Sequence, residues 1–132
     1  MGDRNATDLP TLPGQPIVVP YAPQLALLKQ SSLVITHAGL NTTLEALAQG
    51  VPLIAIPLTH DEPAIAARIV WNGVGERLSP ARLRPEKLRA LIQQVLNQPH
   101  YRQNAMRLQQ AIAHSGGTTL AADILEKAIH SV

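Results

Sequence analysis

The chain has 132 residues, of which 45% are hydrophobic, and a formal net charge of +2. This length supports one domain with a hydrophobic core, and the absence of cysteine excludes disulfides and thiolate metal sites. No apolar run approaches the roughly 20 residues that a membrane span needs, and no secretory signal is evident at the N-terminus, so we expect a cytoplasmic protein.

Short apolar runs alternate with helical segments over the first part of the chain. Residues 1–16 are rich in Pro, Gly, Asp and Asn and predict a loop. The following elements are predicted in chain order: a strand at 17–19 that Pro20 ends, a short helix at 23–29, a strand at 33–36, a helix at 42–49, a strand at 53–56, a helix at 63–72 and a marginal strand at 74–78.

The remainder of the chain predicts helices only. Apolar residues recur at helical spacing over 88–96, 101–112 and 120–129, and Gly116-Gly117 separates the last of these segments. Unbroken apolar strands joined by helices predict an α/β fold, with a Rossmann-like parallel sheet flanked by helices and a helical C-terminal segment. Ligands of such sheets bind beyond the carboxyl ends of the strands.

The segment THAGLNTTLE, residues 36–45, leads from the strand at 33–36 into the next helix. We expect Asn41, Thr42 and Thr43 on the first helical turn, where unpaired backbone N–H groups and the positive end of the helix dipole attract a phosphate. The threonine hydroxyls would add donors. Taken alone, these residues could equally be an ordinary helix N-cap cluster.

Three flanking residues favour a nucleotide-sugar pocket at this helix start. His37 lies across the turn, and Gly39 lets a ligand approach the backbone closely. Glu45 follows one turn further along, where a carboxylate near a phosphate is unfavourable unless sugar hydroxyls need an acceptor. His37 could instead bond only a nearby carbonyl, and Glu45 could be a solvated carboxylate at a helix start.

Three motifs resemble the donor-binding signature of family 1 UDP-dependent glycosyltransferases, which have the two-domain GT-B fold: YAPQ at 21–24, HAGLNTTLE at 37–45 and DEP at 61–63. Within the family, residues 21–25, 35–41 and 66–69 are most similar to bacterial zeaxanthin (carotenoid) glucosyltransferases. The resemblance implies that residues 17–132 form the C-terminal nucleotide-sugar-binding domain of a GT-B enzyme. It also implies that the N-terminal acceptor domain is absent from this chain.

The resemblance assigns the nucleotide to the first two motifs. Tyr21 would stack on uracil, and Gln24 would bond the edge of the base or sugar. His37 would contact the diphosphate or the donor sugar as a phosphate partner rather than as the catalytic base, beside Gly39, Asn41 and Thr42. Glu45 would hold both ribose hydroxyls, which favours UDP over dTDP.

The third motif is expected to bind the donor hexose. Asp61 and Glu62 stand where the family usually has Asp-Gln, whose side chains hold the hexose hydroxyls. Glu62 departs from that pattern, because a carboxylate accepts but does not donate and adds negative charge near the diphosphate. His60 beside Asp61 provides too few ligands for a metal, and neither a metal nor a cofactor is expected.

We therefore expect the donor domain of an inverting glycosyltransferase that transfers a hexose from a UDP-sugar to a lipophilic hydroxyl acceptor such as a carotenoid. The acceptor base is expected in the missing domain, so this chain alone would bind donor without transferring sugar. The alternatives are a stand-alone subunit of a split glycosyltransferase that needs a partner chain, and a degenerate relative with an inactive pocket.

Basic residues dominate the segment 68–107. They form either a solvated surface or a patch that rests on anionic lipid, which would make the protein membrane-peripheral. No interleaved aromatic residues support nucleic-acid binding, and an exposed sheet edge would allow a homo-oligomer. The basic residues are Arg68, Arg77, Arg82, Arg84, Lys87, Arg89, Arg102 and Arg107, and the only acids among them are Glu76 and Glu86.

Overall fold

The structure is a computed structural model that describes residues 13–130. Three parallel strands, β1 (Val34–Thr36), β2 (Leu53–Ala55) and β3 (Gly75–Arg77), form a sheet in that order. Val34 pairs with Leu53, and Leu53 pairs with Gly75. Parallel neighbours need a crossover connection, and a helix between each two successive strands supplies it.

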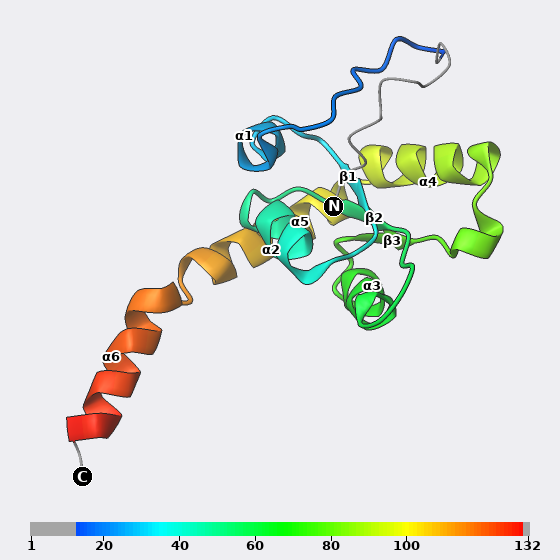
Figure 1. The fold of residues 1–132 in the computed structure, drawn as a ribbon. Coiled ribbons are helices and arrows are strands. Elements are labelled where there is room, and N and C mark those ends of the chain that lie inside the picture. The colour runs from blue at the N-terminus through cyan, green and yellow to red at the C-terminus, as the bar shows by residue number, and fades with distance from the viewer. Residues whose placement is uncertain (1–12, 131–132) are drawn as a thin grey trace.

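Helices cover both faces of the sheet (Figure 1). They are α1 (Gln24–Leu28), α2 (Leu40–Ala48), α3 (Glu62–Trp71), the 3-10 helix η2 (Pro80–Arg82), α4 (Pro85–Asn97), α5 (Pro99–Ala113) and α6 (Gly117–His130). Leu53 and Ala55 of β2 face a layer formed by α2, α3 and α5, whereas Ile54 faces α4 and Tyr101. The predicted α/β sheet flanked by helices is confirmed.

β3 is held in place by a close backbone approach and by a polar cluster. A Cβ atom on Gly75 would lie 1.9 Å from the Leu53 carbonyl oxygen, so only glycine fits at this point of the sheet. The neighbouring Glu76 accepts a hydrogen bond from the Tyr101 hydroxyl (2.5 Å). Gln94 donates to that same hydroxyl oxygen (2.6 Å) and to the Glu76 carboxylate (3.2 Å), which joins β3 to α4 and α5.

The predicted elements agree with the structure except for the first strand. The helices and strands between residues 23 and 78 begin and end within two residues of the predicted bounds. The predicted strand at 17–19 is wrong: these residues are not in a strand, and Ile17 is 93% exposed. A strand requires a neighbour for its backbone groups, and none of residues 13–130 supplies one here. Of the predicted loop at 1–16, residues 1–12 lie outside the described residues.

Helix α6 and the Trp71 side chain are exposed rather than packed against the sheet and its covering helices. No residue of α6 is buried, and Figure 1 shows this helix extending away from the sheet. Trp71, the last residue of α3, is 87% exposed.

Among the helices of residues 13–130, none is both long enough and apolar enough to cross a membrane.

Candidate functional site

A tight turn connects β1 to the start of α2. Ala38 is buried with a φ of 73°, in the left-handed region that non-glycine residues seldom adopt. Its N–H donates to the Thr36 hydroxyl oxygen (3.2 Å), which fixes the turn. A Cβ atom on Gly39 would lie 2.7 Å from Nε2 of His37, so the imidazole ring lies directly over this glycine. The turn therefore brings His37 to the N-terminus of α2.

The first turn of α2 offers backbone donors to the space beside His37. The N–H groups of Leu40, Asn41 and Thr42 precede the first intrahelical hydrogen bond, which runs from Thr43 N–H to the Gly39 carbonyl (3.0 Å). Asn41 is exposed and Thr42 is partly buried. Thr43 differs from the expectation that it donates to a ligand: it is buried, and its hydroxyl donates to the Gly39 carbonyl oxygen (2.9 Å).

Residues from α1 and α2 meet beside this helix start. The Gln24 side-chain amide donates to the Glu45 carboxylate (2.5 Å) and lies 3.4 Å from the Thr42 hydroxyl oxygen. Tyr21, Gln24 and Glu45 line one open pocket of about 700 Å³, and Tyr21 is 83% exposed there. The structure thus groups three of the predicted nucleotide-binding residues, Tyr21, Gln24 and Glu45, around a solvent-accessible hollow, and Thr42 lies within reach of Gln24.

Glu62, the first residue of α3, is held inside its own loop. One carboxylate oxygen accepts the N–H groups of Leu58 (2.6 Å) and Thr59 (2.8 Å), and the other lies 4.0 Å from Nε2 of His37. The two backbone donors hold the pKa of Glu62 below its ordinary value against the opposing effect of burial, and His37 and His60 lower it further. Glu62 therefore fixes the loop that precedes α3 and faces His37.

The role of Glu62 in this loop was missed by the sequence interpretation, although a signal was present. Thr59 and Glu62 have the S/T-x-x-E spacing of a capping box, although α3 begins at Glu62 with Asp61 as its N-cap, so this carboxylate caps the backbone of the turn that precedes the helix. Asp61, by contrast, is exposed, and its side chain forms no cap hydrogen bond with α3. His60 Nδ1 lies 2.8 Å from the Thr59 hydroxyl oxygen. Residues 13–130 contain no group of three or more potential metal ligands.

Comparison with known proteins identifies the protein family that this chain resembles. The model of the family described as "UDP-glucoronosyl and UDP-glucosyl transferase" matches residues 4–116. The zeaxanthin glucosyltransferase of Pseudescherichia vulneris is 42% identical over 112 residues, which cover 85% of this chain and 27% of that enzyme. The chain therefore spans about a quarter of the length of this relative.

Solved structures of glycosyltransferases have the same fold. The glycotransferase of kitacinnamycin matches with a TM-score of 0.84 and 32% identity over 91% of this chain and 32% of that one. Os79 from O. sativa, solved in complex with UDP and deoxynivalenol-3-glucoside, matches with a TM-score of 0.76 and 33% identity over 86% of this chain and 29% of that one. The architecture is that of the C-terminal half of a GT-B fold. The chain belongs to the UDP-glucoronosyl and UDP-glucosyl transferase family, whose members include zeaxanthin glucosyltransferases.

Proposed function

We propose that this chain is the donor-binding part of an inverting glycosyltransferase that transfers a hexose from a UDP-sugar to a lipophilic hydroxyl acceptor. The observation that carries the proposal is the position of Glu45. Its carboxylate lies at the open pocket beside the start of α2, where Gln24 holds one of its oxygens. A carboxylate in that position can accept hydrogen bonds from both hydroxyls of a ribose, while the exposed ring of Tyr21 offers a surface for the base.

The diphosphate belongs at the N-terminus of α2 in this proposal. The free N–H groups of residues 40–42 and the helix dipole attract negative charge, and Asn41 and Thr42 add polar side chains. His37 lies above Gly39 at the same helix end. During transfer, negative charge grows on the departing UDP, and donors that are already in position would stabilise it without rearrangement.

The hexose would lie toward α3. Asp61 is exposed at the start of this helix and can accept hydrogen bonds from sugar hydroxyls. Glu62 contributes mainly through the loop that it closes and through His37, because its Oε2 atom already accepts two backbone donors. The donor subsites thus follow the carboxyl edge of the sheet, the edge at which ligands of parallel α/β sheets bind.

A relative named zeaxanthin glucosyltransferase supports a carotenoid or a similar lipophilic alcohol as the acceptor. The residue that deprotonates this acceptor would come from the larger part of the enzyme that the chain does not span, supplied either by the same polypeptide or by a partner subunit. The chain alone would therefore bind the donor without transferring sugar. No cofactor or metal enters this proposal.

Isothermal titration of the chain with UDP, UMP, dTDP and GDP tests the proposal. We expect UDP to bind most tightly, because it alone combines uracil, two phosphates and both ribose hydroxyls. Glu45→Ala should weaken UDP binding about tenfold, the loss of roughly one charge-assisted hydrogen bond. Glu86→Ala removes an exposed carboxylate from α4 and should leave the affinity unchanged. Equal affinity for all four nucleotides, or no binding at all, would refute the proposal.

A further inference from the structure

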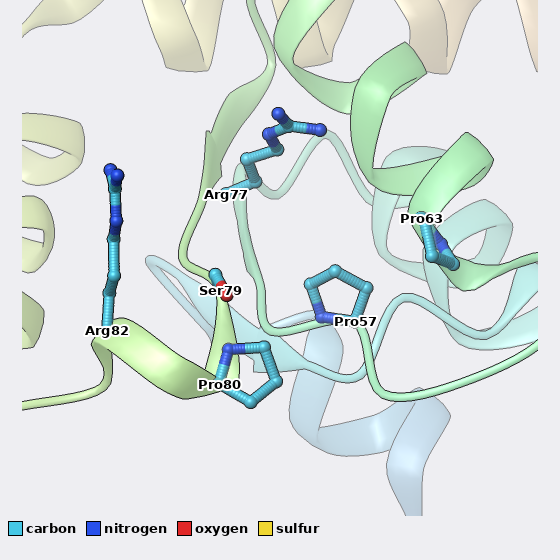
Figure 2. A pocket seen from close by; sticks show the side chains of 6 residues that line it. All are labelled: Pro57, Pro63, Arg77, Ser79, Pro80 and Arg82. Atoms are coloured by element: carbon cyan, nitrogen blue, oxygen red, sulfur yellow. The ribbon is translucent and has the colours of Figure 1, made fainter.

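A second pocket opens at the carboxyl ends of β2 and β3. It has a volume of about 540 Å³ and shares no lining residue with the pocket around Glu45. Figure 2 shows the Arg77 and Arg82 side chains pointing the same way on either side of Ser79. The lining residues are Pro57, Pro63, Arg77, Ser79, Pro80 and Arg82.

Within the part of the chain that the structure describes, no acidic residue neutralises the positive charge of this pocket. Within residues 13–130, neither the Arg77 nor the Arg82 guanidinium group forms a hydrogen bond or an ion pair. Glu76, the acid next to Arg77 in sequence, already accepts hydrogen bonds from Tyr101 and Gln94. The Ser79 hydroxyl makes no cap hydrogen bond with η2 and no other hydrogen bond among the described residues. Two cationic groups and one hydroxyl therefore remain available to a ligand.

The walls of this pocket are stiff. Three of its six lining residues are prolines, whose fixed φ angles reduce the backbone freedom that a ligand would otherwise have to restrict. The two arginines come from different elements, Arg77 from the end of β3 and Arg82 from the end of η2. A guanidinium group presents a planar fork of donors that matches the oxygens of a phosphate, so two such groups around one hollow favour a phosphate over a smaller or singly charged anion.

We propose that the Arg77–Ser79–Arg82 pocket binds a phosphate-bearing ligand, at a site that shares no lining residue with the Glu45 pocket and borders the start of α3. Both guanidinium groups donate to phosphate oxygens, and the Ser79 hydroxyl adds a third donor. The ligand is either a free phosphate ester or the headgroup of an anionic lipid, because both present the same oxygens. Arg84 and Lys87, which follow Arg82 in sequence and are exposed, add positive charge that would speed the approach of either one.

Amide NMR of the 132-residue chain, titrated with inorganic phosphate at constant ionic strength, tests this site. Saturable shifts are expected at residues 77–82. The double variant Arg77→Gln/Arg82→Gln should weaken the response by about tenfold or more. The control Arg89→Gln/Arg107→Gln removes the same charge from exposed positions on α4 and α5 and should leave the response intact. Both variants alter exposed side chains, and circular dichroism verifies that they fold.

Vesicles identify the source of the phosphate. A lipid headgroup predicts co-sedimentation with vesicles of phosphatidylcholine and phosphatidic acid, lost in the double variant and kept in the control. A free ester predicts that glycerol 3-phosphate shifts the same amides while vesicles do not bind. Absence of saturable shifts at 77–82, or an unchanged response in the double variant, would overturn the proposal. Glu45→Ala should not alter these shifts, so this site and the donor pocket can fail separately.

Discussion

At the scale of single residues, Glu62 shows how one carboxylate can hold a loop of the candidate site and also face a side chain from another loop. Its Oε2 atom holds the backbone of Leu58 and Thr59, and its Oε1 atom faces the His37 ring. The spacing of Thr59 and Glu62 is a local signal that sequence reasoning could have used. The approach of His37 to Glu62 joins two loops that are far apart in sequence, so only the folded sheet reveals it.

Removing the Glu62 carboxylate should loosen the loop before α3. In Glu62→Ala, amide hydrogen exchange at Leu58 and Thr59 should accelerate about tenfold, since both N–H groups lose a charged acceptor. Glu62→Gln keeps one acceptor oxygen and should give an intermediate rate. Unchanged exchange in the alanine variant would show that the loop is held by other contacts.

The same hydrogen bonds should respond to acid. Because they hold the pKa of Glu62 below 4.5, they contribute fully at a pH above 4.5 and are lost as the pH falls through the lowered value. The amide chemical shifts of Leu58 and Thr59 should therefore report protonation of Glu62 with a midpoint below 4.5. A midpoint above 4.5 would contradict the hydrogen-bonded geometry of this carboxylate.

The sequence predicts the positions of some residues around α2 correctly, but not the orientation of every side chain. Asn41, Thr42 and Glu45 follow a strand and a glycine-bearing turn, so the pattern alone predicts a helix start with polar side chains. Thr43 was misjudged, because whether a threonine hydroxyl faces a ligand or its own helix depends on burial. The hydroxyl of its neighbour Thr42 is directed instead toward the Gln24 side chain.

At the scale of elements, the strands of the sheet were predictable because each is a short apolar run bounded by turn residues. The run at 17–19 has the same composition yet forms no strand, since strand formation depends on a neighbour that the segment itself does not encode. β3 is the opposite case. Its sequence, Gly-Glu-Arg, has little apolar character, and it pairs because Gly75 permits close approach to Leu53 and because Glu76 is held by α4 and α5.

The cluster of Glu76, Gln94 and Tyr101 should therefore contribute to stability. Burial, and then the hydrogen bond with Glu76, raises the pKa of Tyr101, which stays neutral and donates to that carboxylate. Tyr101→Phe removes this donor and should lower the free energy of unfolding in urea by about 1–3 kcal/mol. Tyr21→Phe alters an exposed tyrosine and should cost nothing measurable. Superimposable unfolding curves for all three proteins would assign the cluster no energetic role.

At the scale of the whole molecule, two surfaces lack a covering layer within residues 13–130. β1 has a neighbouring strand on one side only, and Ile35 in it is half exposed. α6 carries Leu120, Ile124 and Ile129 on its exposed surface. The family relationship was evident from short motifs, because they are local in sequence. The exposure of these surfaces was not, because it depends on contacts between elements that are far apart in the sequence.

Because no residue of α6 is buried, deleting residues 117–132 should leave the body intact. We expect the free energy of unfolding to change by less than about 0.5 kcal/mol, the range of surface changes that touch no core contact. Urea unfolding followed by circular dichroism measures this value. A larger loss would mean that α6 folds back onto the body in solution. Sedimentation velocity on the same two proteins would show whether the free edge of β1 leads to self-association.

The position of Trp71 has a practical consequence for every such measurement. It is the only tryptophan in the chain and is already almost fully in water at the end of α3. Its emission maximum should resemble that of an unfolded peptide. Denaturation of the core should therefore change the intrinsic fluorescence very little. A blue shift of that emission would instead report that another surface has covered this corner, which makes the indole a built-in probe of assembly.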